Sequence, residues 1–239
     1  MDRRSPLFFD ALTDNHAAMI DRFWQHLLGS YCVLCRAVVK GAEGDRQLCR
    51  WCLASLPWLS APEPDTPPQG IARAFAPLGY EGAARQWVLD AKHERGLVSA
   101  RTLGVLLAES LLDAYPLPSE RPGILLPVPL SRRRLRTRGH NQALLIGQPV
   151  ARRLNLRLDR HSARRTRHTA LLAGLDPVRR HAEVAAGFSV SALPEGSRVA
   201  IIDDVVTTGA TASALADAIL LAGASEVHLW AATRAPHSA

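Results

Sequence analysis

The residues best placed to do chemistry lie in the stretch 199–211, where an apolar run leads into two adjacent carboxylates. The run 199–202 is too short for a helix and predicts a buried parallel strand. Asp203 and Asp204 follow at the carboxyl end of that strand, the edge of an open α/β sheet at which ligands bind. The two carboxylates suit the hydroxyl groups of a sugar.

A short loop follows the acidic pair and leads into a helix that we expect over residues 212–222. The loop consists of Thr207, Thr208, Gly209, Ala210 and Thr211. Backbone N–H groups and hydroxyls in such a loop bind an anion, and the helix dipole adds to the attraction. Gly209 lets the backbone approach a ligand closely or take a positive φ. A phosphate at the loop and a sugar at the acidic pair together describe a ribose 5-phosphate.

A second strand, loop and helix carry a dense group of arginines. We expect the strand over 123–129 and the helix over 141–154, with Asn141 as its N-cap. The expected loop contains Arg132, Arg133, Arg134, Arg136 and Arg138. Guanidinium groups bind phosphate oxygens in bidentate fashion, so this loop suits a pyrophosphate. Arg138 and Gly139 lie next to the helix and are the best candidates for contact with the ligand.

The positive charge of the chain is concentrated in one region. The formal net charge is +7, and residues 121–180 hold fifteen arginines against two acids, a local net charge of +13. Charge of this density favours a polyanionic partner such as pyrophosphate or nucleic acid. A solvated basic surface, in a chain whose genome favours arginine, is the alternative. Lys92, one of two lysines, either reaches a phosphate or is an ordinary lysine at a helix end.

The four cysteines form two pairs with the spacing of a metal site. They are Cys32, Cys35, Cys49 and Cys52, with two residues inside each pair and thirteen between the pairs. Each pair forms a knuckle that offers two thiolates, and four thiolates complete a closed tetrahedral zinc site. An iron–sulfur cluster is the chemical alternative, but separated knuckles favour zinc. A closed site is structural, so we expect no catalysis there.

The order of elements predicts four segments and an α/β fold. We expect an N-terminal amphipathic helix within 1–30, a zinc ribbon over 31–59, a proline-rich linker over 60–70 and an α/β domain over 71–239. In that domain, strands alternate with helices, which predicts a doubly wound parallel sheet. The polar, basic segment 160–182 is expected to be a mobile loop.

The sequence also indicates where the protein works. Its apolar runs fall short of the roughly 20 residues of a membrane-spanning helix. Its first residues hold too short an apolar stretch for a signal peptide. We therefore expect a soluble protein of the cytoplasm without a membrane span, and in that compartment paired cysteines bind metal more often than they form disulfides.

The motif at 199–211 resembles the binding site for phosphoribosyl pyrophosphate (PRPP) of type I phosphoribosyltransferases. Together with the cysteine knuckles, the stretch 127–130 and the Arg-Gly-x-Asn-Gln motif at 138–142, it resembles the ComF family of bacterial competence proteins. The resemblance covers about residue 31 to the C-terminus. It implies a type I phosphoribosyltransferase-like fold. In such a fold Asp203 and Asp204 hold the ribose 2′ and 3′ hydroxyls, the loop holds the 5-phosphate, and Mg²⁺ accompanies PRPP.

The same resemblance implies a role in natural transformation, the movement of single-stranded DNA into the cytoplasm, with other competence proteins as further partners. The chain departs from the family pattern at two positions. Leu172, three residues after Thr169, stands where the family has glutamine, and Glu183 stands about where it has asparagine. These departures put binding of an acceptor base, or transfer to it, in doubt, but they leave the PRPP arm unaffected.

Three functions are consistent with these features. The first is a PRPP-binding protein that serves DNA uptake. The second is an active phosphoribosyltransferase of nucleotide metabolism, in which Asp203 and Asp204 orient the ribose and arginines stabilise the departing pyrophosphate. The third is a nucleic-acid-binding adaptor that senses PRPP without turnover. A full amidophosphoribosyltransferase is disfavoured because every cysteine belongs to the ribbon and none is left as a glutaminase nucleophile.

Overall fold

The structure, a computed structural model, describes residues 30–40, 46–93, 96–166 and 187–236. The chain divides into two compact units that meet between Ser55 and Leu56. The amphipathic helix expected within residues 1–30 lies outside the described residues, which begin at Ser30. Within the described part of the chain, no helix is both long and apolar enough to cross a membrane.

The first unit is a small ribbon with little apolar core. Strand β1 (Ser30–Tyr31) pairs antiparallel with β2 (Val38–Val39), and a short helix, α3 (Arg50–Ala54), follows. Its buried apolar positions include Cys32, Val39 and Leu48. Two of these are small side chains, so apolar burial alone supplies little of the stability that a fold requires.

The second unit is built on a six-stranded sheet in which every pair of neighbours is parallel. The strand order is β3-β10-β9-β5-β6, with β4 beside the end of β10. The strands are β3 (Arg73–Phe75), β4 (Leu78–Gly79), β5 (Ile124–Pro127), β6 (Arg157–Leu158), β9 (Ser197–Val206) and β10 (Ala224–Arg234). The expected α/β class with a parallel sheet is confirmed.

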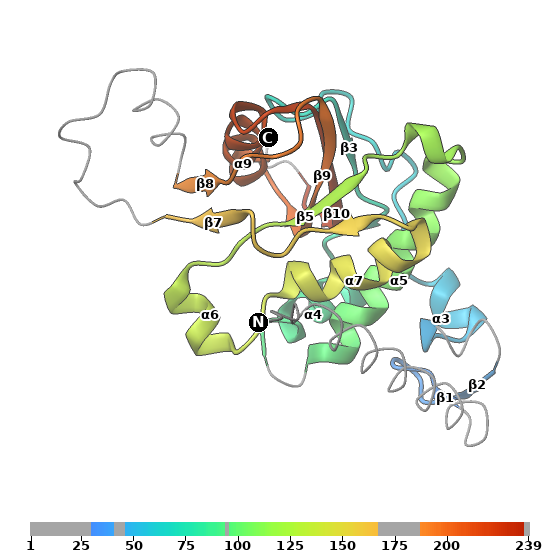
Figure 1. Cartoon of the computed structure of the whole chain (residues 1–239). Helices are drawn as coiled ribbons and strands as arrows, with labels where there is room; N and C mark the ends of the chain where they lie inside the picture. The colour runs from blue at the N-terminus through green and yellow to red at the C-terminus, as the bar shows by residue number, and fades with distance from the viewer. Residues whose placement is uncertain (1–29, 41–45, 94–95, 167–186, 237–239) are drawn as a thin grey trace, which may run out of the picture. The chain divides into compact units, whose positions relative to one another are not determined.

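Helices cover both faces of this sheet (Figure 1). The longer ones, α5 and α7, pack against each other on one face, and α9 lies on the other. Gly104 lets α5 and α7 approach closely, because a Cβ there would lie 2.4 Å from the carbonyl oxygen of Ile146. The helices are α4 (Gly82–Asp90), α5 (Leu97–Ala114), the 3₁₀ turn η3 (Pro118–Glu120), α6 (Arg132–Arg138), α7 (Gln142–Leu154) and α9 (Ala210–Leu221).

The chain reverses its direction of travel across the sheet between β5 and β9. After β5 it passes through α6 and α7 to β6 at one edge, whereas after β9 it passes through α9 to β10 on the other side. Ligands of open α/β sheets bind in the crevice outside the carboxyl ends of strands at such a switch point. Pro127, the last residue of β5, lies opposite Ile202, so the acidic pair begins one residue beyond the end of β5.

Two expectations about loops were wrong. The arginine-rich segment forms the helix α6, because Ser131 caps its N-terminus and Gly139, at φ 75°, ends it. Arginine and leucine are also good helix formers. In the segment 160–182, residues 163–165 form β7 (Ala163–Arg165), which pairs antiparallel with β8 (Phe188–Val190). Residues 167–182 of that expected loop lie outside the described residues.

The proline-rich segment, expected as a linker, lies within the second unit and is attached to the sheet. The carbonyl oxygen of Pro62 accepts from Ala76 N–H at 2.9 Å, and Glu63 pairs with Arg73. Arg234 Nη2 donates to the carbonyl oxygen of Ala61 at 2.7 Å. These contacts place the segment beside the carboxyl end of β10.

A buried polar network joins the segment 226–230 of β10 to the C-terminal end of α5. Trp230 Nε1 donates to the Tyr115 hydroxyl at 3.1 Å, and that hydroxyl lies 3.0 Å from His228 Nδ1. His228 Nε2 pairs with Glu226. Because the carboxylate only accepts, Nε2 carries the proton and Nδ1 accepts from Tyr115. A neutral His228 thus gives every side chain of this network a hydrogen-bond partner.

This network predicts a loss of stability in mild acid. Burial lowers the pKa of His228, although Glu226 opposes the shift. A histidine whose folded pKa is depressed contributes its full stability above the unfolded pKa of about 6.5 and loses it as the pH falls. Between pH 7.5 and 5.5, the free energy of unfolding should fall by about 1 kcal/mol more in the wild type than in His228→Gln.

Urea unfolding at the two pH values measures this difference. His161 is exposed, so the matched variant His161→Gln should keep the full decline of the wild type. An equal decline in wild type and His228→Gln would contradict the assignment of a neutral, buried His228.

Candidate functional site

The acidic pair lies where β9 runs past the end of β5 while still paired with β10, and its two residues differ in burial. Asp204 is 6% exposed, whereas Asp203 is half-buried. Asp203 Oδ1 accepts from the Asp204 N–H at 2.9 Å, and Asp204 Oδ1 accepts from the Val205 N–H at 3.0 Å. Thr233 of β10 donates its hydroxyl to the carbonyl oxygen of Asp204 at 2.9 Å. These bonds fix the backbone and one oxygen of each carboxylate.

Two adjacent carboxylates at a buried strand end resist full ionisation. Burial and the charge of Asp204 raise the pKa of Asp203 well above its usual value, and the charge of Lys92 opposes this shift. Like charges at short distance disfavour the doubly ionised pair. Hydroxyl donors or a cation at the pair would favour it, which is the chemistry of a sugar diol or of a divalent metal ion.

The loop after the pair has the geometry of an anion-binding turn. Gly209 is the N-cap of α9 at φ 75° and has no side chain with which to cap the helix. Thr207 and Thr208 are exposed, and Thr208 Oγ1 accepts from the Ala210 N–H with an N–O distance of 3.4 Å. Pro68 packs on the turn, because a Cβ added at Gly209 would lie 2.4 Å from Pro68 Cγ. A cavity of ≈ 230 Å³ opens beside the two threonines, under the proline-rich segment.

The second strand–helix unit brings α7 up to the same edge of the sheet. Asn141 caps α7 as expected, since its Oδ1 accepts from the Ala143 N–H at 3.0 Å. Its Nδ2 donates to the carbonyl oxygen of Val128, just past β5, at 3.0 Å. His140 Nε2 lies 2.8 Å from the carbonyl oxygen of Ala91, which ties the segment that carries Lys92 to the start of α7.

One side chain that the sequence analysis did not single out connects Arg138 to the acidic pair. Gln142, the first residue of α7, donates from Nε2 to Asp204 Oδ2 at 3.3 Å. Its Oε1 accepts from Arg138 Nη1 at 3.1 Å. Its place in the Arg-Gly-x-Asn-Gln motif was visible, but the contact with a strand 62 residues away was not.

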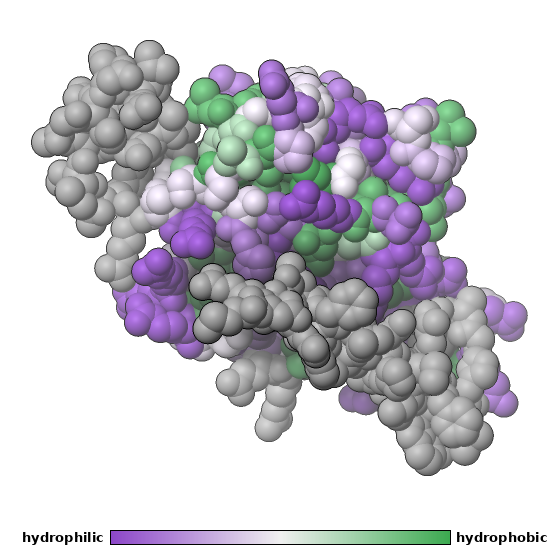
Figure 2. All heavy atoms as spheres, in the orientation of Figure 1, coloured by the Kyte–Doolittle hydropathy of each residue, from purple (hydrophilic) through white to green (hydrophobic). Residues whose placement is uncertain are grey.

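The structure therefore assembles only part of the expected basic arm beside the acids. Arg138 is half-buried and linked through Gln142 to Asp204, and Lys92 is near enough to influence the pKa of Asp203. The other arginines of α6 are exposed; they are Arg132, Arg133, Arg134 and Arg136. Figure 2 shows hydrophilic side chains gathered over α6 and β7. The acceptor-side positions Thr169, Leu172 and Glu183 lie outside the described residues.

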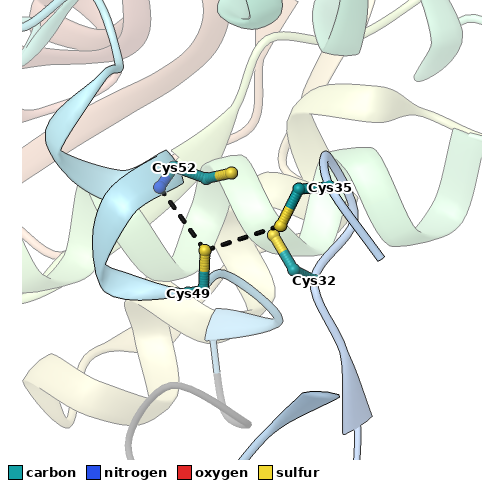
Figure 3. A group of neighbouring side chains, drawn as sticks. All are labelled: Cys32, Cys35, Cys49 and Cys52. Carbon is teal, nitrogen blue, oxygen red and sulfur yellow. Dashed lines mark hydrogen bonds between the residues drawn. The ribbon is translucent and has the colours of Figure 1, made fainter. Parts of the chain in front are cut away.

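The four cysteines of the first unit converge on one point (Figure 3). Their sulfur atoms all lie within 4.8 Å of one another, and Cys35 Sγ is 3.6 Å from Cys49 Sγ. Four sulfurs around one zinc ion at about 2.3 Å are separated by about 3.8 Å. The donor set and its spacing thus fit a tetrahedral metal ion.

The thiols of this cluster differ in how readily they ionise. Burial opposes ionisation of Cys32, but backbone hydrogen bonds from Cys35, Cys49 and Leu34 lower the pKa of its thiol to about 6. Burial and the neighbouring cysteines raise the pKa of Cys52 to about 12. Four thiolates at this spacing therefore need a cation between them.

Comparison with known proteins places these features in a family. No protein-family model matches the chain. The DNA utilization protein YhgH of Escherichia coli O6:H1 is 30% identical over 207 residues, which cover 84% of this chain and 90% of the relative. The YhgH protein of Escherichia coli K12 is 33% identical over 140 residues, 59% of this chain and 62% of the relative.

A third relative carries the name that the sequence motifs indicated. Competence protein F of Haemophilus influenzae is 32% identical over 139 residues, which cover 56% of this chain and 61% of the relative. The chain shares with these proteins most of its length at about 30% identity, and it therefore belongs to the ComF family.

Proposed function

We propose that this protein binds PRPP with Mg²⁺ at the carboxyl edge of its sheet and acts on single-stranded DNA during uptake into the cytoplasm. The observation that carries the proposal is the arrangement at the switch point. An acidic pair and the start of α9, both from the β9–α9 connection, lie near two basic side chains, Arg138 after β5 and Lys92 after α4. A ribose with a phosphate at each end requires these three kinds of group.

In this proposal each group has one role. Asp203 and Asp204 accept hydrogen bonds from the 2′ and 3′ hydroxyls of the ribose. The backbone of the loop 207–211 and the start of α9 hold the 5-phosphate. Arg138, Gly139 and Lys92 face the pyrophosphate, whose charge Mg²⁺ offsets when PRPP is bound.

The proposal extends to binding and not to a transfer reaction. Displacement at C1 of the ribose needs mainly positioning and electrostatics, which these residues supply. It also needs an acceptor, and the positions that the resemblance assigns to the acceptor side lie outside the described residues. A turnover screen with the common bases separates a transferase from a PRPP-binding protein.

Two observations support DNA as the second ligand. The relatives carry the names DNA utilization protein and competence protein, and residues 121–180 carry a local charge of +13. The exposed arginines of α6 place part of that charge on the surface. Guanidinium groups bridge phosphates and stack on bases, so they suit a single strand.

We further propose that the cysteine cluster holds one structural zinc ion. Zinc would join the two knuckles of a unit that has little apolar core, and a site with four protein ligands leaves no position for a substrate. The first testable consequence is about one zinc per chain by elemental analysis of protein purified without chelators. Cys49→Ser should lose the metal and become more sensitive to proteolysis within the first unit.

Ser55→Ala is a matched control at the C-terminal end of α3, the helix whose N-cap is Cys49. The hydroxyl of Ser55 donates to the carbonyl oxygen of Cys52 and offers no zinc ligand. This variant should keep its zinc. Full metal content and unchanged protease resistance in Cys49→Ser would contradict a four-cysteine structural site.

The second consequence concerns PRPP affinity. Asp204→Asn should weaken binding of PRPP with Mg²⁺ by about tenfold or more, because hydrogen bonds to a charged acceptor are lost. Thr208→Ala should weaken it less, because backbone N–H groups still hold the phosphate. Titration calorimetry measures both, with the exposed Asp113→Asn on α5 as control. Absence of binding by folded wild-type protein, or equal binding by Asp204→Asn, would count against the site.

The third consequence is a steep salt dependence of DNA binding. The logarithm of the affinity for a labelled single strand should fall with the logarithm of salt concentration by roughly 0.7 per phosphate contacted. Replacing Arg132, Arg133 and Arg134 together by alanine should make this slope shallower by up to about 2. The same three positions changed to lysine should keep the slope. Fluorescence anisotropy measures it, and a flat salt response would remove the electrostatic case for DNA.

A further inference from the structure

We infer that Gln142 is a positioning residue that couples Arg138, on the pyrophosphate side of the proposed site, to Asp204 of the acidic pair. The inference rests on the proposed binding of PRPP, because it says how the two halves of that ligand influence each other. Gln142 contacts both residues. Its Oε1 lies 3.1 Å from Arg138 Nη1, and its Nε2 lies 3.3 Å from Asp204 Oδ2.

The chemistry of the two partners fixes the orientation of the amide. A guanidinium group only donates and an ionised carboxylate only accepts. The amide oxygen of Gln142 must therefore face Arg138 and its nitrogen must face Asp204. A flipped amide would place a donor against a donor and an acceptor against an acceptor. Arg138 thus selects the rotamer of Gln142 that donates to Asp204.

The surroundings hold the bridge at both ends. Gln142 is 6% exposed, so its hydrogen bonds lie largely out of water and the loss of either would leave a buried polar group unpaired. Its backbone begins α7 directly after Asn141, whose side chain caps the helix and reaches past the end of β5. Gly139 ends α6 in the left-handed conformation and sets the turn between Arg138 and α7.

This arrangement makes a prediction that simple contact with ligand does not. Asp204 Oδ1 already accepts from the Val205 N–H, so the Gln142 bond to Oδ2 sets the orientation of the carboxylate group that would face a ribose. Arg138 faces the pyrophosphate side in the proposed site. A change at Arg138 should therefore alter the affinity for a ligand without pyrophosphate, and it should do so only through Gln142.

The test uses ribose 5-phosphate with Mg²⁺ as the probe, measured by titration calorimetry on the full chain. Arg138→Ala and Gln142→Met should each weaken binding about tenfold, the effect of losing a hydrogen bond to a charged group. The double variant should bind as weakly as Gln142→Met alone, because Arg138 acts through Gln142. Methionine keeps the length and the helix propensity of glutamine.

Two controls separate coupling from charge and from general damage. Arg85→Ala removes an exposed positive charge from α4, and Gln148→Leu removes an amide from the same helix α7. Both should leave ribose 5-phosphate affinity unchanged. Gln142→Glu keeps the acceptor for Arg138 but has no N–H for an ionised Asp204, so it should lose as much affinity as Gln142→Met. It also tests the coupling role if Gln142→Met does not fold.

The outcomes distinguish this inference from the proposed function. Losses that multiply in the double variant, or wild-type affinity in Gln142→Met and Gln142→Glu, would overturn the coupling role while PRPP binding by the wild type still supports the proposed function. Wild-type protein that binds neither PRPP nor ribose 5-phosphate would overturn both.

Discussion

The site depends on one electrostatic constraint, which is that two adjacent carboxylates stand at the buried end of the central strand. Neither charge is stable there without donors or a cation nearby. Several contacts of the second unit meet this need: Gln142 donates to Asp204, backbone N–H groups donate to both side chains, and Lys92 opposes the rise in the pKa of Asp203. Under the proposed function, a sugar diol would donate to the acceptor positions that remain on the two carboxylates.

The order of the strands positions the groups that surround the acidic pair. Because β5 and β9 are neighbours whose connections leave in opposite directions, the starts of α7 and α9 come to one edge from two sides. The buried network of Tyr115, His228 and Trp230 holds β10 to α5 away from this edge. The polar groups of the candidate site lie at the carboxyl edge, where ligands of parallel α/β sheets bind.

The sequence predicted those parts of the site that depend on local pattern. The strand that carries Asp203 and Asp204, the cap at Asn141 and the turn at Gly139 follow from periodicity, capping chemistry and glycine conformation, and the structure has them. The strand does not end at the acidic pair as expected, because β9 continues beside β10 to Val206. The clustering of the cysteines followed from their spacing. The helix α6 was missed because the density of arginines suggested a ligand loop and hid the cap at Ser131. The pairing of β7 with β8, the attachment of the proline-rich segment and the role of Gln142 depend on contacts between distant parts of the chain, which no local pattern reports.

The proposed function gives one account, in which a phosphoribosyl ligand and a single strand of DNA are handled by the same protein. The most direct measurement is a crystal structure of the full chain with PRPP and Mg²⁺. The account predicts the ribose hydroxyls on Asp203 and Asp204, the 5-phosphate at the turn of Gly209, and the pyrophosphate toward Arg138. PRPP bound elsewhere on the chain, or bound at this edge with its ribose turned away from the acidic pair, would contradict it.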